Sequence, residues 1–140
     1  MSARADAFAQ AAEALIGTPF ALHGRSPQHG LDCVGLVACA LEACGNAPRV
    51  PEGYGLRNAS ISRFLVLARG NGFEAISEAE AIKASRGDLL LVEPGPGQSH
   101  LLIALGPDRF VHAHAGLRRI AVHNGPLGWL IEHHWRLRAS

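Results

Sequence analysis

The sequence has few cysteines, and their spacing fits no common metal or disulfide motif. Three cysteines occur in 140 residues, and this odd number argues against a disulfide framework. Cys33, Cys39 and Cys44 are separated by six and five residues, which matches neither a CxxC pair nor a zinc ribbon. We therefore expect three reduced thiols, with Cys39 and Cys44 buried in a helix.

The sequence also lacks a membrane-length apolar run and a secretory signal. No window approaches the length of a transmembrane helix, so we expect no membrane insertion. The first ten residues contain no apolar signal-peptide core, and Asp6 and Glu13 lie near the N-terminus. These features predict synthesis in the cytoplasm without a signal peptide. A target outside the membrane would then require a separate means of delivery.

Positive charge is sparse. The net charge is +1, Lys83 is the single lysine, and the twelve arginines form no basic run. A nucleic-acid partner is therefore not expected, because such partners require a basic patch or stripe. Repeats and low-complexity tracts are absent as well. At 140 residues and 48% hydrophobic composition, the chain is predicted to form one domain over residues 1–140.

Helical patterns precede strand patterns along the chain. Apolar residues at three- and four-residue steps predict helices over residues 4–16, 33–44 and 60–69. Apolar runs bounded by turn residues predict strands over residues 73–76, 89–92, 100–105, 109–114, 118–122 and 134–138. A surface loop is expected over residues 47–55 and a capped turn or short helix over residues 77–81. Helices followed by a hairpin-rich antiparallel sheet indicate an α+β fold.

Cys33 lies where a breaker-rich loop becomes an apolar helix. Asp32 is a favoured N-cap residue, and Gly45 is a favoured residue after a helix end. The unpaired N–H groups and the helix dipole at this end favour thiolate over thiol, which predicts a lowered pKa for Cys33. We therefore expect a reactive sulfur at this position.

Three of the eight histidines lie on one predicted hairpin. If Gly106-Pro107-Asp108 forms a three-residue loop, His100 faces His114, and His112 lies on the same side of the sheet. A two-residue loop would turn His100 to the opposite side. A cysteine nucleophile needs a base and a group that orients the base, and histidine is the usual base. These residues predict a Cys/His site, with the register left open.

Four segments of the chain, taken together, resemble the NlpC family of papain-like cell-wall cysteine peptidases. They are Gly17-Thr18-Pro19-Phe20, Asp32-Cys33-Val34-Gly35, Arg86-Gly87-Asp88-Leu89-Leu90, and the hairpin His100–Leu105 with Phe110–Ala113. In the family these positions carry a GTPY-like start, a DCSG-like nucleophile turn, a PGDL-like strand and an HVGIY…HA-like hairpin. The resemblance implies a papain-like α+β fold with N-terminal helices packed on an antiparallel sheet.

The resemblance also implies site roles. Cys33 would be the nucleophile, His100 the general base and acid, and His112 the polar group that orients His100. The substrate would be a peptidoglycan stem peptide, usually cleaved at the γ-D-glutamyl–diaminopimelate bond, and no cofactor or metal would be needed. The tail containing Trp129 and Trp135-Arg136 is similar to the phage-tail and gene-transfer-agent branch. That likeness implies phage-tail-like partners and a particle that acts on the cell wall.

Several residues are expected to influence substrate binding: Phe20, His23, Asp32, Val34 and His114. Val34 stands where many family members have serine, and Phe20 replaces a tyrosine. His23 replaces a frequent glycine. Asp32 is interpreted as a helix cap that could also contact a substrate amine. His114 is a rival to His112 because the three-residue loop would place it directly opposite His100.

Three alternatives remain. The chain could be an amidase or acyltransferase acting on another small amide or ester. It could be a non-catalytic wall or tail module, in which case Cys33 would be no more easily alkylated than Cys39 and Cys44. Thiolate and imidazole also bind zinc, so a metal site formed by Cys33 and the three hairpin histidines is a further alternative.

Overall fold

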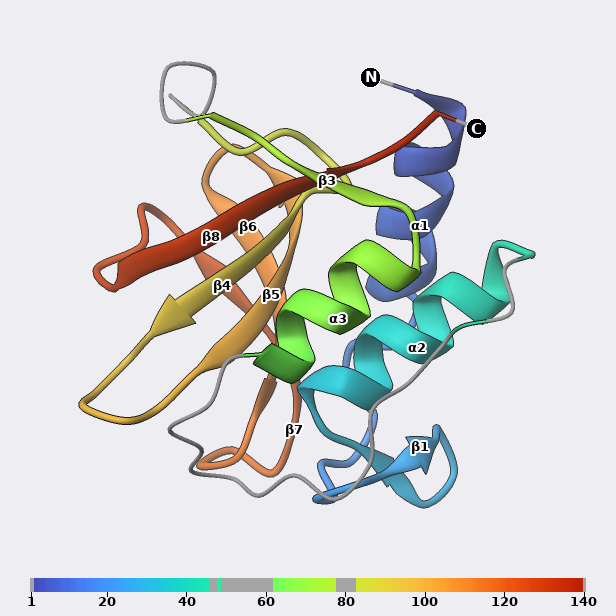
Figure 1. Ribbon diagram of the computed structural model, residues 1–140. Coiled ribbons are helices and arrows are strands. Elements are labelled where there is room, and N and C mark those ends of the chain that lie inside the picture. Colours follow the sequence, from blue (N-terminus) through green and yellow to red (C-terminus); the bar gives the residue numbers. More distant parts are fainter. Residues whose placement is uncertain (1, 46–47, 49–61, 78–82, 140) are drawn as a thin grey trace.

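The computed structural model describes residues 2–45, 48, 62–77 and 83–139. The helices are α1 (Ala3–Glu13), α2 (Cys33–Ala43) and α3 (Ser62–Gly70). The strands are β1 (Arg25–Ser26), β2 (Gly30–Leu31), β3 (Phe73–Ala75), β4 (Leu89–Glu93), β5 (His100–Gly106), β6 (Arg109–His114), β7 (Arg119–Asn124) and β8 (Leu130–Leu137). The α+β prediction is confirmed (Figure 1).

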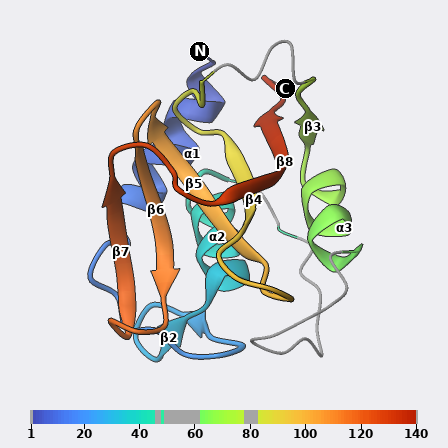
Figure 2. The ribbon, with the colours of Figure 1, turned by 90° about the vertical axis from the view of Figure 1, so that its left-hand side faces the viewer.

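Six strands form one antiparallel sheet in the order β3-β8-β4-β5-β6-β7. β1 and β2 form a separate two-stranded hairpin just before α2. Helices α1 and α2 pack on one another and on β5, and Figure 2 shows both on the same side of the sheet. Helix α3 contacts β3, the edge strand at the other end of the strand order from β7. The expected arrangement of helices on an antiparallel sheet is therefore present.

The two faces of the sheet carry separate apolar clusters. The main core joins the helices to alternate strand residues such as Leu101, Ile103 and Val111. The residues between them point the other way, and Leu102 and Phe110 belong to a smaller cluster on the outer face. This alternation places the even-numbered hairpin residues, including the three histidines, on the outer side of the sheet.

The C-terminal strand differs from the sequence prediction. It begins at Leu130 rather than at residue 134, and it lies inside the sheet between β3 and β4. His134 and Trp135 are 9% and 3% exposed, so this end of the chain is buried within the sheet. The periodicity was weak because polar His133 and His134 interrupt the apolar pattern of this strand.

Other boundaries agree within a few residues. The short β1–β2 hairpin was not predicted, because each strand has two residues and leaves no periodic signal. All but Pro48 of the expected loop over residues 47–55 lies outside the described residues, as does most of the expected turn over residues 77–81. Among the described residues, no helix is long and apolar enough to cross a membrane.

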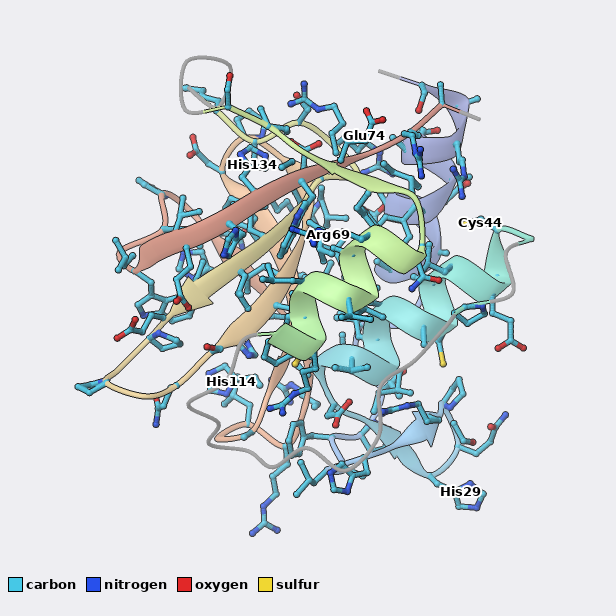
Figure 3. The ribbon with its side chains drawn as sticks, viewed as in Figure 1. His29, Cys44, Arg69, Glu74, His114 and His134 are labelled. Atoms are coloured by element: carbon cyan, nitrogen blue, oxygen red, sulfur yellow. The ribbon has the colours of Figure 1, made fainter. Side chains whose placement is uncertain are left out.

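A buried ionic network ties β8 to the segment before β4. Asp88 is fully buried, its Oδ2 lies 2.6 Å from His134 Nε2, and Arg136 Nε donates to its Oδ1 at 3.0 Å. Burial alone would raise the pKa of the Asp88 carboxyl, but the bonds from His134 and Arg136 outweigh burial and hold this pKa below its usual range. Figure 3 shows His134 in the upper part of the view and His114 in the lower part, so this network is separate from the hairpin histidines.

Replacing Asp88 should destabilise the fold strongly. In Asp88→Ala, the buried side chain of His134 and the Arg136 guanidinium lose their carboxylate, and removing one partner of a buried pair costs about 3 kcal/mol or more. Urea unfolding would measure this loss. Arg109→Ala is the matched control, because Arg109 forms an exposed pair with Glu13 and should change stability by about 0.5 kcal/mol or less. Equal effects in the two variants would contradict the assigned role of the network.

Candidate active site

Helix α2 begins at Cys33, and Asp32 caps it as predicted. Asp32 Oδ1 accepts a hydrogen bond from Gly35 N–H at 2.9 Å, which satisfies one unpaired donor of the first turn. A Cβ at Gly35 would overlap the carbonyl oxygen of Gly24, so only glycine allows the preceding loop to lie this close to the helix. The loop and the helix start are thereby fixed against one another, with the Cys33 side chain directed into a pocket.

The register of the histidine hairpin depends on a β-bulge. Gly106 pairs with Arg109, so the turn itself has two residues rather than three. The register then shifts between Ala104 and Gly106, and Ile103 pairs with Val111. This extra residue restores the alignment that a three-residue loop would have produced, and the three histidines share one face. The loop therefore has the shorter of the two lengths that the sequence left open, whereas the three histidines share the face expected for the longer one.

His100 and His112 are joined by a direct hydrogen bond. His100 Nε2 lies 2.9 Å from His112 Nδ1, and the two rings meet edge to face with centroids 5.1 Å apart. Continuing the Ile103–Val111 register makes His112 the diagonal neighbour of His100 and makes His114 the directly opposite residue. Long side chains can reach a diagonal neighbour across two strands. His100 therefore bonds to His112, its diagonal neighbour, although His114 is the residue directly opposite.

His114 has a different partner. Its Nδ1 accepts a hydrogen bond from Leu117 N–H at 3.0 Å, within the turn that follows β6. Its ring lies 5.4 Å from the ring of His112, measured between centroids. His114 therefore lines the pocket beside His112 but does not bond to His100.

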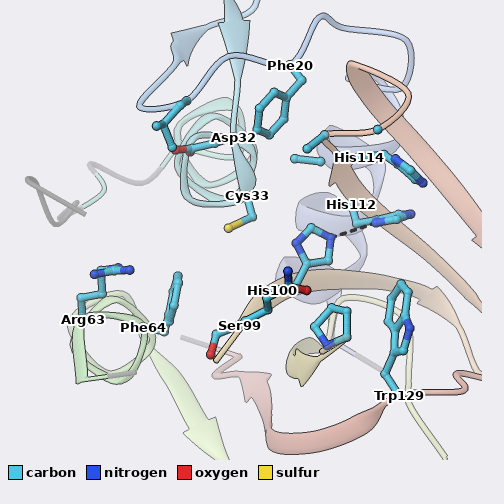
Figure 4. Close-up of a pocket in the computed structure, with 16 residues that line it drawn as sticks. Phe20, Asp32, Cys33, Arg63, Phe64, Ser99, His100, His112, His114 and Trp129 are labelled. Atoms are coloured by element: carbon cyan, nitrogen blue, oxygen red, sulfur yellow. Dashed lines mark hydrogen bonds between the residues drawn. The ribbon is translucent and has the colours of Figure 1, made fainter. Parts of the chain in front are cut away.

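A pocket of about 390 Å³ brings these groups together. Figure 4 shows Cys33 and His100 projecting into it from opposite walls, with the second ring nitrogen of His100 on the side nearer Cys33. Trp129 closes the far side of the histidine pair, with centroid distances of 6.3 Å to His100 and 6.2 Å to His112. The pocket lining comprises Phe20, Leu22, Asp32, Cys33, Arg63, Phe64, Pro94, Gln98, Ser99, His100, His112, Ala113, His114, Ala115, Gly116 and Trp129.

The thiol of Cys33 has a raised pKa rather than the lowered pKa that the helix start predicted. Burial raises the pKa from 9.0 to about 11, and the Asp32 carboxylate adds to the rise. Hydrogen bonds with the backbone of Leu101, Val34 and Cys33 itself act in the opposite direction. The backbone groups at the helix start therefore do favour the thiolate, but the protein walls around the sulfur remove more hydration energy than these groups restore.

The pKa values of the His100 and His112 imidazoles are lowered, in contrast to the raised pKa of the Cys33 thiol. Burial lowers the pKa of His100 from 6.5 to about 3, and the neighbouring His112 and His114 lower it further. Burial also lowers the pKa of His112 to about 4, with contributions from His114 and His123. At neutral pH the site therefore holds a neutral thiol and two neutral imidazoles. In this state one of the two hydrogen-bonded ring nitrogens carries the proton and donates, and the other accepts the hydrogen bond.

These shifts predict a stability plateau between about pH 6.5 and pH 9. On acidification from pH 6.5, the unfolded chain takes up protons at His100 and His112 that the folded protein binds only near pH 3 and pH 4, so the free energy of unfolding should fall. On alkalinisation from pH 9.0, the unfolded Cys33 ionises whereas the folded thiol holds its proton to about pH 11, so stability should fall again.

Urea unfolding at steps from about pH 4.5 to pH 10 would measure both limbs while avoiding most carboxyl titration. His100→Asn should flatten the acidic limb, and Cys33→Ala should flatten the alkaline one. An acidic limb that is unchanged in the histidine variant would contradict the assignment.

The sequence-predicted substrate contacts divide into two groups. Phe20, Asp32 and His114 line the pocket. Val34 is fully buried in the main core and does not line the pocket, so its side chain is not positioned for substrate contact. His23 is exposed, and its role at the site is through its backbone N–H, which donates to Asp32 Oδ2 at 2.8 Å. For these two residues the resemblance in sequence did not indicate that their side chains lie outside the pocket lining.

Other pocket residues were missed. Arg63 and Phe64 come from α3, with the Arg63 guanidinium 4.9 Å from the centroid of the Phe64 ring. Ser99 directly precedes His100, and Trp129 follows the turn after β7. A helical stripe indicated that Phe64 would be buried, but no local pattern relates α3 to a hairpin more than 30 residues away. Trp129 was interpreted as part of a tail, whereas the loop before β8 folds it over the histidines.

The remaining cysteines lie apart from the pocket lining. Cys39 and Cys44 are half-buried rather than fully buried, and Cys33, Cys39 and Cys44 are thiols rather than disulfides. Cys39 Sγ is 3.3 Å from the carbonyl oxygen of Arg25, and Cys44 Sγ is 3.3 Å from that of Leu41. Within the described ranges, no three His, Cys, Asp or Glu side chains are grouped so that they could hold a metal ion.

Comparison with known proteins shows similarity at the level of family and fold. The profile of the NlpC/P60 family matches residues 17–129. The P60 domain of antigen MAP1204 from M. avium subspecies paratuberculosis aligns with a TM-score of 0.63 at 20% identity, over 96% of this chain and 94% of that chain. The NlpC/p60 domain of the peptidoglycan hydrolase SagA aligns with a TM-score of 0.57 at 25% identity, over 86% of this chain and 88% of that chain.

A further structure, NlpC2 from Trichomonas vaginalis, aligns with a TM-score of 0.68 at 16% identity. The alignment covers 95% of this chain and 46% of that chain, so this chain spans less than half the length of the Trichomonas protein. Comparison with the curated proteins gives no match.

Proposed function

Because the chain belongs to the NlpC/P60 family, we propose that it is a cysteine peptidase that hydrolyses amide bonds in peptidoglycan stem peptides. The observation that carries the proposal is the hydrogen-bonded pair His100–His112 opposite Cys33 in one pocket. A nucleophile, a base and a group that orients the base are the minimal set for covalent amide hydrolysis. The bond we propose is γ-D-glutamyl–diaminopimelate, and the peptidoglycan hydrolase SagA, with a similar domain, supports this substrate class.

The proposed reaction begins from the neutral thiol and imidazole. His100 Nδ1 accepts the thiol proton as Cys33 Sγ attacks the scissile carbonyl carbon, and the carbonyl electron pair moves onto oxygen. This role requires the proton of neutral His100 to lie on Nε2, where it donates to His112 Nδ1. His112 then stabilises the imidazolium that forms, since its ring nitrogen accepts the hydrogen bond in both states.

Collapse of the tetrahedral intermediate breaks the C–N bond, and the imidazolium returns its proton to the departing nitrogen. Water then attacks the thioester, giving one proton to His100. This proton passes to sulfur as the C–S bond breaks, so the products are a carboxylic acid and the restored thiol. Two of the backbone groups that favour the thiolate, those of Cys33 and Val34, lie at the start of α2, where N–H donors could also stabilise the oxyanion by about 3 kcal/mol each.

Digestion of diaminopimelate-type peptidoglycan by the purified protein tests the proposal. Mass spectrometry of released muropeptides should show stems cut after D-glutamate, and the fragment masses would identify the bond. Fragments with other masses would contradict the proposed bond and identify the bond that is cleaved instead. If peptidoglycan yields no fragments while another amide or ester acylates Cys33, the activity would instead be that of an amidase or acyltransferase.

The proposal includes delivery by a phage-like tail particle that acts on the cell wall. It is supported by the likeness of the segment with Trp129 and Trp135-Arg136 to the phage-tail and gene-transfer-agent branch. The chain should then copurify with tail particles on a density gradient and appear in their peptide mass spectra. Its absence from such particles would remove the delivery proposal and leave the hydrolase proposal intact.

A further inference from the structure

Trp129 covers the His100–His112 pair on the side away from Cys33 (Figure 4). Its ring centroid lies 6.3 Å from that of His100 and 6.2 Å from that of His112, and the interplanar angles are 83° and 65°. Edge-to-face contact is a favoured geometry of aromatic rings at such distances. One indole therefore packs against both imidazoles of the proposed reaction.

The indole is itself held in place by the segment between β7 and β8. Leu127 and Trp129 both pack against the apolar cluster on the outer face of the sheet. His123 Nε2 donates to the carbonyl oxygen of Pro126 at 3.2 Å, and the His123 ring lies 5.7 Å from the indole, measured between centroids. Contacts with β7 and with the outer cluster therefore fix where the indole lies.

Covering the pair on this side keeps water away from the hydrogen bond between the imidazoles. His112 is 5% exposed, and His100 is half-buried although it lines the pocket. A hydrogen bond is electrostatically stronger where water is excluded. Burial is also the largest cause of the lowered pKa values of both imidazoles, so the cover favours an uncharged pair.

We propose that Trp129 is a positioning residue for the proposed reaction: its indole excludes water from the His100–His112 pair and so keeps His100 uncharged, oriented and able to accept the thiol proton. This proposal rests on the proposed function and adds to it a residue that takes no part in bond making or proton transfer.

Trp129 is uncharged, so replacing it changes the water around the pair and leaves every neighbouring charge in place. The titratable and charged groups of the surrounding elements are His114 from β6, His123 from β7, Cys33 and Asp32 at the start of α2, Arg63 from α3, and Glu132 of β8, which lies 3.4 Å from Ser99. A change in the titration of the pair in a Trp129 variant would therefore report the loss of cover.

Titration of the imidazole nitrogens by NMR tests the proposal without any substrate. In the wild-type protein His100 and His112 should stay uncharged down to about pH 5, because their pKa values are lowered to about 3 and about 4. In Trp129→Ala both titration midpoints should rise towards the ordinary value of about 6.5. Trp129→Phe keeps an aromatic ring and should lie closer to the wild type. Unchanged midpoints in Trp129→Ala would overturn the proposal.

Kinetics on a soluble stem peptide gives the second readout, because kcat/KM depends on the protonation of the free enzyme. An imidazole of ordinary pKa is only about one-tenth neutral at pH 5.5. The ratio of kcat/KM at pH 5.5 to that at pH 7.5 should therefore fall about tenfold in Trp129→Ala relative to the wild type, and Trp129→Phe should restore most of it. A higher KM with an unchanged pH profile would instead make Trp129 a substrate contact and overturn the proposal.

Trp135→Phe is the matched control, because Trp135 is buried in the main core and lies outside the pocket lining. This variant should lose stability but keep the wild-type midpoints and pH ratio. Equal shifts in the Trp129 and Trp135 variants would refute a specific role for Trp129. If Trp129→Ala fails to fold, the wild-type titration decides, since midpoints near 6.5 would refute a dry pair. If the wild type cleaves no stem peptide while the midpoints shift as expected, the proposed function fails and the effect of Trp129 on the pair is still supported.

Discussion

Cys33→Ala should reduce peptidoglycan cleavage by about 10⁴-fold or more, because the acyl-enzyme cannot form without the sulfur. The variant should fold, since Cys33 is half-buried at the first position of α2 and the Asp32 cap does not involve its side chain. Muropeptide release measured by mass spectrometry gives the activity, and urea unfolding gives the stability.

Cys39→Ala, within α2, and Cys44→Ala, at the C-cap of α2, are controls of the same chemistry. Both thiols lie away from the pocket lining, so both variants should retain activity within about twofold of wild type. Alkylation with substrate-like reagents should modify Cys33 first. Full activity in Cys33→Ala, or its loss of folding, would contradict the nucleophile assignment and favour a structural role.

His100 and His112 should differ in how much activity their substitution removes. His100→Ala deletes the group that takes and returns the proton and should reduce cleavage by about 10³-fold or more. His112→Asn should retain a measurable fraction, with about a 10- to 100-fold loss, because the amide oxygen can still accept a hydrogen bond from His100 Nε2. Steady-state kinetics on a soluble stem peptide would measure both.

His112→Leu is the matched variant, since it keeps bulk but cannot accept a hydrogen bond. We expect it to be less active than His112→Asn and to bind substrate with a similar KM, because orientation of the base affects kcat. His114→Asn should be close to wild type, as His114 bonds to the turn at Leu117 and not to His100. Equal losses at His100 and His112 would be incompatible with the division of roles.

The sequence was most informative where the signal is local. The Asp32 cap, the start of α2 and the alternation along β5 and β6 follow from neighbouring residues, and each is present in the structure. The pKa of Cys33 was predicted in the wrong direction because only the helix start is visible in sequence. The burial that outweighs it is contributed by residues from distant parts of the chain.

The hairpin and the pocket walls show a second limit of prediction from the sequence. No residue pattern indicated the bulge between Ala104 and Gly106, yet the bulge decides which face His100 occupies. Arg63 and Trp129 reach the pocket from segments that the sequence does not connect to it. Such contacts depend on tertiary packing, which neither periodicity nor motif spacing describes.

The position of β8 has a consequence for how the molecule folds. β3 and β4 are neighbours in sequence, but β8 lies between them, and its pairing joins Phe73 to Leu137 across more than 60 residues. Non-local pairing of this kind raises the contact order and slows folding, because a long loop must close before the contacts form. Until residues 130–137 dock, both inner edges stay unpaired and Trp129 is not held over the histidines. A chain still being synthesised would therefore lack a complete pocket, and its open strand edges would be the main risk of aggregation.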